Sequence, residues 1–192
     1  MSDSRAWRRS ESVGAAAAAD FVGQTLAVTA EQLCRQYAPA VCRFAAMAAR
    51  TPSEADDIAQ DALLRAVRGL SSFDAGRGSI EAWLWRIVAN AAHDHQRAER
   101  RRVALWTRLS GFWDSPSESV ESLALDRIDN SRLLAAVRAM GPRDRMLLAL
   151  RFGADLDLRA VGSALGMSDA TAGKAVLRAL EKLRATLEVR PR

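Results

Sequence analysis

The sequence has few of the residues that metal sites, disulfides and nucleophilic catalysis need. It contains two cysteines and two histidines in 192 residues. Cys34 and Cys42 stand eight positions apart in an expected helix, roughly 12 Å along its axis, which excludes a local disulfide. We interpret both as small core residues in a reducing cytosol, ahead of a redox role. His93 and His95 point to different helix faces and do not make a zinc-binding pair. These absences predict a protein with no metal, no cofactor and no enzymatic activity.

The sequence also lacks a long apolar run. No stretch approaches the ~20 residues that a membrane-spanning helix needs. Arg8 and Arg9 could begin a twin-arginine export signal, but Glu11 and Asp20 interrupt the apolar run that should follow. We therefore expect a soluble, cytoplasmic chain with no targeting peptide and no membrane insertion.

Hydrophobic residues make up 49% of the chain, charged residues make up 27%, and the formal net charge is +5. This composition is typical of a folded protein, although the abundance of alanine predicts small cores. Most of the positive charge is arginine, which makes forked contacts with phosphate and favours a polyanionic partner. An ordinary solvated surface is the alternative. The length fits two small helical modules.

The pattern along the chain begins with residues 1–28, which hold an alanine run and no sustained apolar stripe. We expect this segment to be disordered or frayed. A helix should follow from Thr29 to about Arg50, with a kink at Pro39. Thr51 should cap a second helix that ends near Gly69, with Pro52 in its first turn and Glu54 completing a capping box.

A third helix is expected from Ile80 to about Arg102, with Ser79 as its cap and Trp85 on the border between its two faces. Its inner face would hold Ile80, Trp83, Leu84, Ile87, Val88 and Ala91. Its outer face would hold Arg86, Asn90, Asp94, Arg97 and Arg101. The inner face can pack against the second helix, and the outer face can contact a partner.

Residues 103–126 change character, with glycine, proline, serine and four acidic residues, and predict a flexible linker. Helical patterns resume in residues 127–192. A short helix ending near Leu165, a turn at Gly166 and a longer helix opened by Ser168 predict a helix-turn-helix. Many helical hairpins share this pattern. The predicted fold class is therefore all-α, with an N-terminal helical bundle and a C-terminal helix-turn-helix bundle joined by the linker.

Taken together, the motifs resemble those of a bacterial sigma factor of the extracytoplasmic-function (ECF) type, which has only conserved regions 2 and 4. The resemblance covers roughly residues 29–187. It rests on Ser53 to Asp61 (SEADDIAQD), Phe73-Asp74, Ala82-Trp83-Leu84 with Ile87 and Asn90, Asp94 with Arg97, and Arg178-Ala179-Leu180 with Leu183-Arg184. It implies region 2 in residues 29–102 and region 4 in residues 127–192.

The resemblance implies partners and roles for particular residues. Asp57, Gln60 and Asp61 would dock on core RNA polymerase, where charge complementarity selects the partner. Phe73 in the loop of residues 71–79 would help to hold a separated base of the minus-ten element. Asn90 would contact a base edge, and phosphates would be bound by Arg86, Arg97 and Arg101. An anti-sigma factor is a further expected partner.

The C-terminal module would bind the minus-thirty-five promoter element as duplex DNA. Its expected contacts are Arg159, Ser168, Thr171, Lys174 and Arg178, with Lys182 a further candidate. The chain departs from the family pattern here, because Gly173 and Ala175 stand where basic residues are usual. Fewer phosphate contacts would weaken salt-sensitive binding.

Three functions follow from these observations. The favoured one is a promoter-specificity subunit that recruits polymerase and helps to open DNA. The departure at positions 173 and 175 motivates a second, a sigma-like decoy that titrates an anti-sigma factor or polymerase without productive initiation. The third, a helix-turn-helix repressor with an unrelated N-terminal domain, would leave the matches in the N-terminal half as coincidence.

Overall fold

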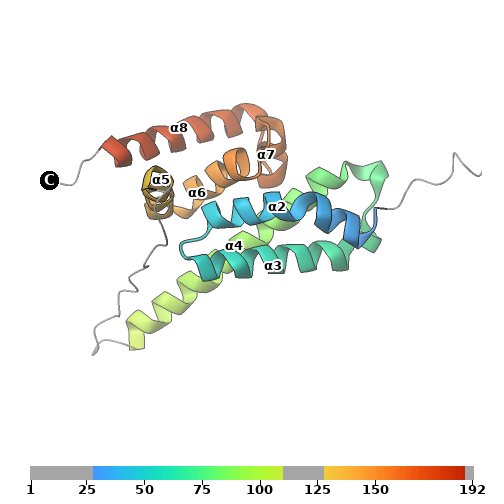
Figure 1. Cartoon of the computed structure of the whole chain (residues 1–192), viewed down its shortest axis with the longest axis horizontal. Helices are drawn as coiled ribbons and strands as arrows, with labels where there is room; N and C mark the ends of the chain where they lie inside the picture. Colours follow the sequence, from blue (N-terminus) through green and yellow to red (C-terminus); the bar gives the residue numbers. More distant parts are fainter. Residues whose placement is uncertain (1–27, 110–127, 189–192) are drawn as a thin grey trace, which may run out of the picture.

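The computed structural model describes residues 28–109 and 128–188, and the regular structure of these residues is entirely helical (Figure 1). The predicted all-α fold class is confirmed. In chain order the elements are α2 (Ala30–Ala48), α3 (Pro52–Gly69), η1 (Leu70–Ser72), η2 (Ala75–Arg77), α4 (Ile80–Leu109), α5 (Ile128–Ala139), α6 (Pro142–Leu148), η3 (Ala149–Gly153), α7 (Leu158–Leu165) and α8 (Asp169–Glu188). We call residues 28–109 the N-terminal half and residues 128–188 the C-terminal half.

The start of each N-terminal helix follows from its capping residues. The Thr29 hydroxyl accepts from the Gln32 amide and the Gln32 side chain accepts from the Thr29 amide, a reciprocal box that opens α2. At α3 the Thr51 hydroxyl accepts from the Glu54 amide as predicted. The Glu54 carboxylate, however, accepts from the Arg50 amide at 2.7 Å, one residue before the expected donor. Ser79 caps α4 through the Ala82 amide.

Helix α4 continues to Leu109, seven residues beyond the predicted end, and so includes the first part of the expected linker. The segment from Val103 to Leu109 has neither glycine nor proline, so nothing in it stops a helix. The first glycine after it is Gly111. Residues 110–126 of the expected linker, residue 127 of the expected C-terminal module and residues 1–27 of the expected N-terminal extension lie outside the described residues.

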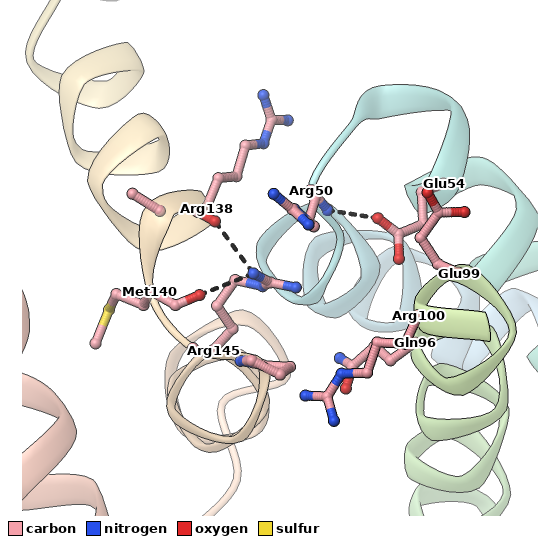
Figure 2. A pocket seen from close by; sticks show the side chains of 11 residues that line it. Arg50, Glu54, Gln96, Glu99, Arg100, Arg138, Met140 and Arg145 are labelled. Carbon is pink, nitrogen blue, oxygen red and sulfur yellow. Dashed lines mark hydrogen bonds between the residues drawn. The ribbon is translucent and has the colours of Figure 1, made fainter. Parts of the chain in front are cut away.

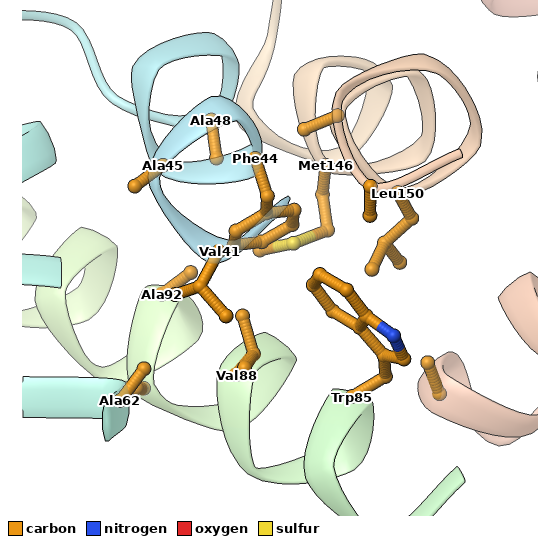
Figure 3. Packing of buried hydrophobic residues seen from close by; sticks show 14 of the residues in the cluster. Val41, Phe44, Ala45, Ala48, Ala62, Trp85, Val88, Ala92, Met146 and Leu150 are labelled. Carbon is orange, nitrogen blue, oxygen red and sulfur yellow. The ribbon is translucent and has the colours of Figure 1, made fainter. Parts of the chain in front are cut away.

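A single hydrophobic core joins the two halves. It holds side chains of α2, α3 and α4 together with side chains of α6, η3, α7 and α8. Trp85, predicted on the border of α4, is only 2% exposed. Its ring meets Phe44 edge to face at 6.0 Å between centroids, and Met146 and Leu150 lie beside it (Figure 3). The prediction for Trp85 was wrong because the C-terminal half covers a face of α4 that the N-terminal bundle alone leaves open.

The two halves meet along a seam, in which α2 packs on η3 and α6 while α4 packs on α7. A side-chain carbon at Gly153 would lie 3.0 Å from both the Arg43 carbonyl oxygen and the Phe44 Cα. Such approaches require a neighbouring backbone to move, so only glycine fits here. The Arg43 guanidinium also donates to the Gly153 carbonyl at 3.1 Å. The backbones of α2 and η3 are therefore in direct contact.

A second contact at the seam is made by Arg145 of α6, whose side chain is only 3% exposed. It donates to the Ala48 carbonyl at the end of α2 at 3.0 Å, and to the Arg138 and Met140 carbonyls at 3.1 and 2.9 Å. Burial lowers the pKa of Arg145 from its ordinary value. One buried side chain thus satisfies carbonyls that end two helices, one in each half.

Two further features concern the sequence expectations. Cys34 is half-buried but Cys42 is exposed, so the prediction of two core cysteines was wrong for Cys42, which lies beside the buried stripe of α2 instead of on it. Among the described residues, no helix combines the length and apolar character needed to cross a membrane, and no three metal-binding side chains gather.

Candidate nucleic-acid interface

Three residues of α3 were predicted to bind polymerase, and two of them are freely exposed on the outer surface of the helix. Asp57 and Gln60 are exposed. Asp61 is only half-buried and is occupied, because its carboxylate receives the Arg65 guanidinium at 2.9 and 2.8 Å and lies 3.3 Å from His95 Nε2. Asp57 and Gln60 are therefore available to a partner, whereas Asp61 also holds α3 against α4.

Arg65 bridges the two helices. Its second terminal nitrogen donates to Asp94 of α4 at 2.7 Å. The hydrogen bond from Arg65 lowers the pKa of Asp94, and the hydrogen bonds to Asp94 and Asp61 raise that of Arg65. Asp94, which the pattern placed on the outer face with arginines, is thus an ion-pair partner of α3. From the sequence, Arg65 was expected on the face of α3 left toward solvent or a partner, although its spacing of four from Asp61 is a recognised helical pair.

The outer face of α4 presents four of the predicted DNA-binding residues together. Arg86, Asn90, Arg97 and Arg101 are all exposed, at spacings of four and seven residues that keep them on one side of the helix. His93 lies beside this row, and its pKa is lowered first by desolvation and then by Arg97. One amide among three guanidiniums can accept and donate to a base while the arginines neutralise phosphates.

The loop between α3 and α4 is held by a pair of aromatic rings. Phe73 is half-buried and its ring lies 5.6 Å from that of Trp83, tilted by 56°. Trp83 also covers Gly69, where an added side-chain carbon would lie 3.3 Å from the indole. The Asp74 carboxylate accepts from the Gly76 amide at 2.9 Å, which shapes the turn. Phe73 therefore anchors the loop, and its remaining exposed part can still meet a base.

The predicted helix-turn-helix is formed by α7 and α8. Gly166 ends α7 in the left-handed conformation, with φ of 67°. At Gly162 an added side-chain carbon would lie 2.7 Å from the Met167 carbonyl oxygen, so the tight turn requires glycine. The Ser168 hydroxyl accepts from the Thr171 amide at 3.3 Å and lies 2.8 Å from the Thr171 hydroxyl. Ser168 is thus the predicted cap of α8.

The polar residues predicted for this module are exposed. Thr171, Lys174 and Arg178 follow one another at spacings of three and four along α8, and Arg159 is exposed on α7. The further candidate Lys182 is already paired with Asp144 of α6 at 2.7 Å. Gly173 and Ala175 are half-buried, and a carbon added at Gly173 would lie 3.3 Å from Leu158. The two small residues thus serve the packing of α8, while the basic residues lie outside it.

The chain is similar to proteins of one family. The Sigma-70 region 2 model matches residues 33–102. The ECF RNA polymerase sigma factor BldN of Streptomyces coelicolor is 27% identical over 138 residues, which cover 72% of this chain and 52% of that relative. The RNA polymerase sigma-E factor of Streptomyces avermitilis is 28% identical over 160 residues, which cover 83% of this chain and 86% of that relative. The chain thus spans about half the length of the first relative and most of the second.

A solved structure shares the fold. It is the sigma factor RpoE in complex with the anti-sigma factor NepR from Bartonella quintana, with a TM-score of 0.66 and 22% sequence identity. The match covers 84% of this chain and 98% of that chain. At this identity the likeness concerns the fold, and it extends across both halves of the present chain.

Proposed function

We propose that this chain is a sigma factor of the ECF type, which binds core RNA polymerase, directs it to specific promoters and helps to open the DNA. It works as a binding subunit in the cytoplasm, without a catalytic step of its own. The observation that carries the proposal is the row of Arg86, Asn90, Arg97 and Arg101 along α4, exposed beside the Phe73 loop within the segment that matches region 2.

In the proposed role, α3 contacts polymerase and α4 contacts the promoter. Asp57 and Gln60 supply the contact with polymerase, and Asp61 orients α3 through Arg65 and His95. The row on α4 binds the upstream edge of the opened region, where Asn90 reads a base and the arginines bind phosphate. Helix α8 binds the upstream element as duplex through Thr171, Lys174 and Arg178, with Ser168 at its start and Arg159 on α7.

A regulatory partner is part of the proposal. The structurally similar RpoE was solved with its anti-sigma factor, and a second match, CnrH, was solved with the cytosolic domain of CnrY. By analogy, an anti-sigma factor would hold the present chain inactive. The decoy alternative loses its main support, since Gly173 and Ala175 are half-buried packing residues and the exposed side of α8 remains basic.

In vitro transcription with purified core enzyme tests the proposal. The full chain should initiate from a subset of promoters in a genomic fragment pool. Binding of core without initiation from any fragment would overturn the proposal and favour the decoy. Failure to bind core at all would favour the repressor.

Two matched variants separate the surfaces. Asn90→Ala should lower initiation about tenfold or more while core binding is unchanged, since one base contact is worth ~1–3 kcal/mol. Gln36→Ala, which truncates an exposed amide on α2, is the control and should initiate normally. Loss of core binding in Asn90→Ala would mean that α4 is assigned to the wrong partner.

The polymerase contact is tested at Asp57, because Asp61 also stabilises the helix pair. Asp57→Lys should weaken core binding and leave binding of an isolated upstream duplex unchanged. Glu181→Lys, which reverses an exposed charge on α8, is the control and should keep core affinity. Unaltered core affinity in Asp57→Lys would remove the assignment of α3.

A further inference from the structure

A pocket of about 260 Å³ opens on the seam between the halves (Figure 2), and none of the residues that line it is among the predicted polymerase or DNA contacts. The N-terminal half contributes Arg50, Gln96 and Arg100 to its walls, and the C-terminal half contributes Arg138 and Arg145. Four arginines, two from each half, therefore line one cavity. The proposed function uses none of them.

These arginines are not in direct contact with an acidic side chain in the described part of the chain. None of the four takes part in an ion pair there. Two carboxylates also line the pocket: Glu54, which accepts from the backbone amide of Arg50 at 2.7 Å and keeps its charge, and Glu99, which pairs with Arg102 at 3.1 Å. Two carboxylates are fewer than the four guanidiniums. The cavity thus has an excess of positive charge that the protein does not neutralise.

Two polar nitrogens of the pocket residues are buried without a partner. They are Nε2 of Gln96 and Nε of Arg138, and Gln96 is 8% exposed as a residue. A buried donor without an acceptor costs roughly 1–3 kcal/mol. Gln96 belongs to the wall formed by α4 and Arg138 to the wall formed by α5, so each half contributes one unpartnered donor to the lining of the pocket.

The environment of Arg145 agrees with this description. Its pKa is lowered first by burial, and Arg50 and Arg100 lower it further, whereas Glu54 opposes them. Like charges have therefore been brought close together at a partly buried place. An anion placed among them would gain forked, charge-assisted hydrogen bonds and relieve this repulsion.

We propose that the seam pocket binds a small phosphate-bearing anion, held by Arg50, Arg100 and Arg138 and by the amide of Gln96. Phosphate suits this set because its oxygens are strong hydrogen-bond acceptors and the guanidinium fork matches them. The ligand contacts both halves at once, so its binding stabilises their packed arrangement over any arrangement in which they separate. It thereby regulates how readily the two halves come apart.

Calorimetric titration of the full chain with pyrophosphate tests the site. Wild type should bind one equivalent saturably, and Arg100→Gln and Arg138→Gln should each weaken binding about tenfold, the value of one charged hydrogen bond. Arg143→Gln removes an exposed arginine of α6 that does not line the pocket and should bind like wild type. Sulfate at matched ionic strength controls for screening. Equal weakening in all three variants, or binding that never saturates, would overturn the proposal.

Two further measurements keep the test independent of folding defects and of DNA. In unmodified protein, pyrophosphate should slow amide hydrogen exchange in residues 149–153 of the seam, and unchanged exchange would contradict the bridging role.

Competition with a short DNA duplex is the second measurement. If the duplex displaces pyrophosphate and depends equally on Arg138, the phosphates come from DNA and the small-ligand site is wrong. Absence of pyrophosphate binding would contradict the proposed seam site but would not change the expected results of the transcription assays. The seam site and the proposed sigma-factor function are therefore tested independently.

Discussion

Helices α3 and α4 are held together at their surface by side-chain charges, whereas α7 and α8 are held together by close backbone approach. In the first pair Arg65 reaches Asp61 on its own helix and Asp94 on the neighbouring one. In the second pair Gly162 leaves no room for a side chain beside the Met167 carbonyl. The ion pair between α3 and α4 therefore depends on the protonation of its groups, whereas the turn between α7 and α8 depends on the volume of the residue at position 162.

A third kind of contact, the shared core at the seam, should be the most sensitive of all. Trp85→Ala removes the largest fully buried side chain of the described residues and should destabilise the protein by about 4 kcal/mol. Leu177→Ala on the exposed side of α8 is the control and should change stability by less than ~0.5 kcal/mol. Urea unfolding measures both. A small effect of Trp85→Ala would mean that the two halves do not share a core in solution.

The polar contact at the seam comes next. Arg145→Met keeps much of the side-chain length but leaves the Ala48, Arg138 and Met140 carbonyls without their donor. We expect a loss of about 3 kcal/mol in urea unfolding. Arg143→Met, at an exposed position of the same helix, should be nearly neutral. Equal stability of the two variants would show that the buried hydrogen bonds add nothing.

Within the second helix pair, two glycines should respond with opposite signs. Gly162→Ala places a carbon 2.7 Å from a backbone oxygen and should cost about 2 kcal/mol. Gly173→Ala meets only the movable end of Leu158 at 3.3 Å, and alanine is the better helix former by up to ~1 kcal/mol. Thermal unfolding should therefore show a lower midpoint for the first and an equal or higher one for the second. A higher midpoint for Gly162→Ala than for Gly173→Ala would show that the volume of the residue does not control the stability of this helix pair.

The ion pair between Arg65 of α3 and Asp94 of α4 should contribute least to stability. Of the contacts compared here, we expect only this contribution to depend on pH. Arg65 lowers the pKa of Asp94 below its ordinary value of 3.8, so the ion pair stabilises the fold above that pH and is lost as the pH falls through the lowered value. Because both groups are substantially exposed, Asp94→Asn should cost only about 0.5 kcal/mol near pH 7. The difference from wild type should vanish in strong acid. Gln36→Ala, which truncates an exposed uncharged side chain of α2, is the control, and its difference from wild type should be the same at every pH.

Local signals along the sequence predicted several elements well. The caps Thr51, Ser79 and Ser168 act locally, through hydrogen bonds to amides three residues away, so a one-dimensional reading finds them. The exposure of Asn90 and its neighbouring arginines was equally predictable from helical spacing. The polymerase and DNA contacts of these residues stay predictions, tested by the variants proposed above.

Other features depended on partners far away in the chain. Trp85 was predicted on the border between the inner and outer faces of α4, because helical periodicity describes a single helix. It carries no information about the C-terminal half, which covers Trp85 in the folded protein. Asp61 and Asp94 looked like free surface acids until α3 and α4 lay side by side with Arg65 between them. Gly173 and Ala175 looked like missing DNA contacts, although their half-buried positions make them packing residues.

The sequence by itself determined the all-helical class, the helix starts, the helix-turn-helix and the resemblance to ECF sigma factors, since these rest on residues close together in the chain. Tertiary structure alone decided that the halves share a core, that Arg145 joins them, and that four arginines from distant segments face one pocket. The physical reason is the distance along the sequence over which each interaction acts. Caps and helical periodicity act over three or four residues, whereas burial, like-charge crowding and the fit of a glycine depend on which segments the fold brings together.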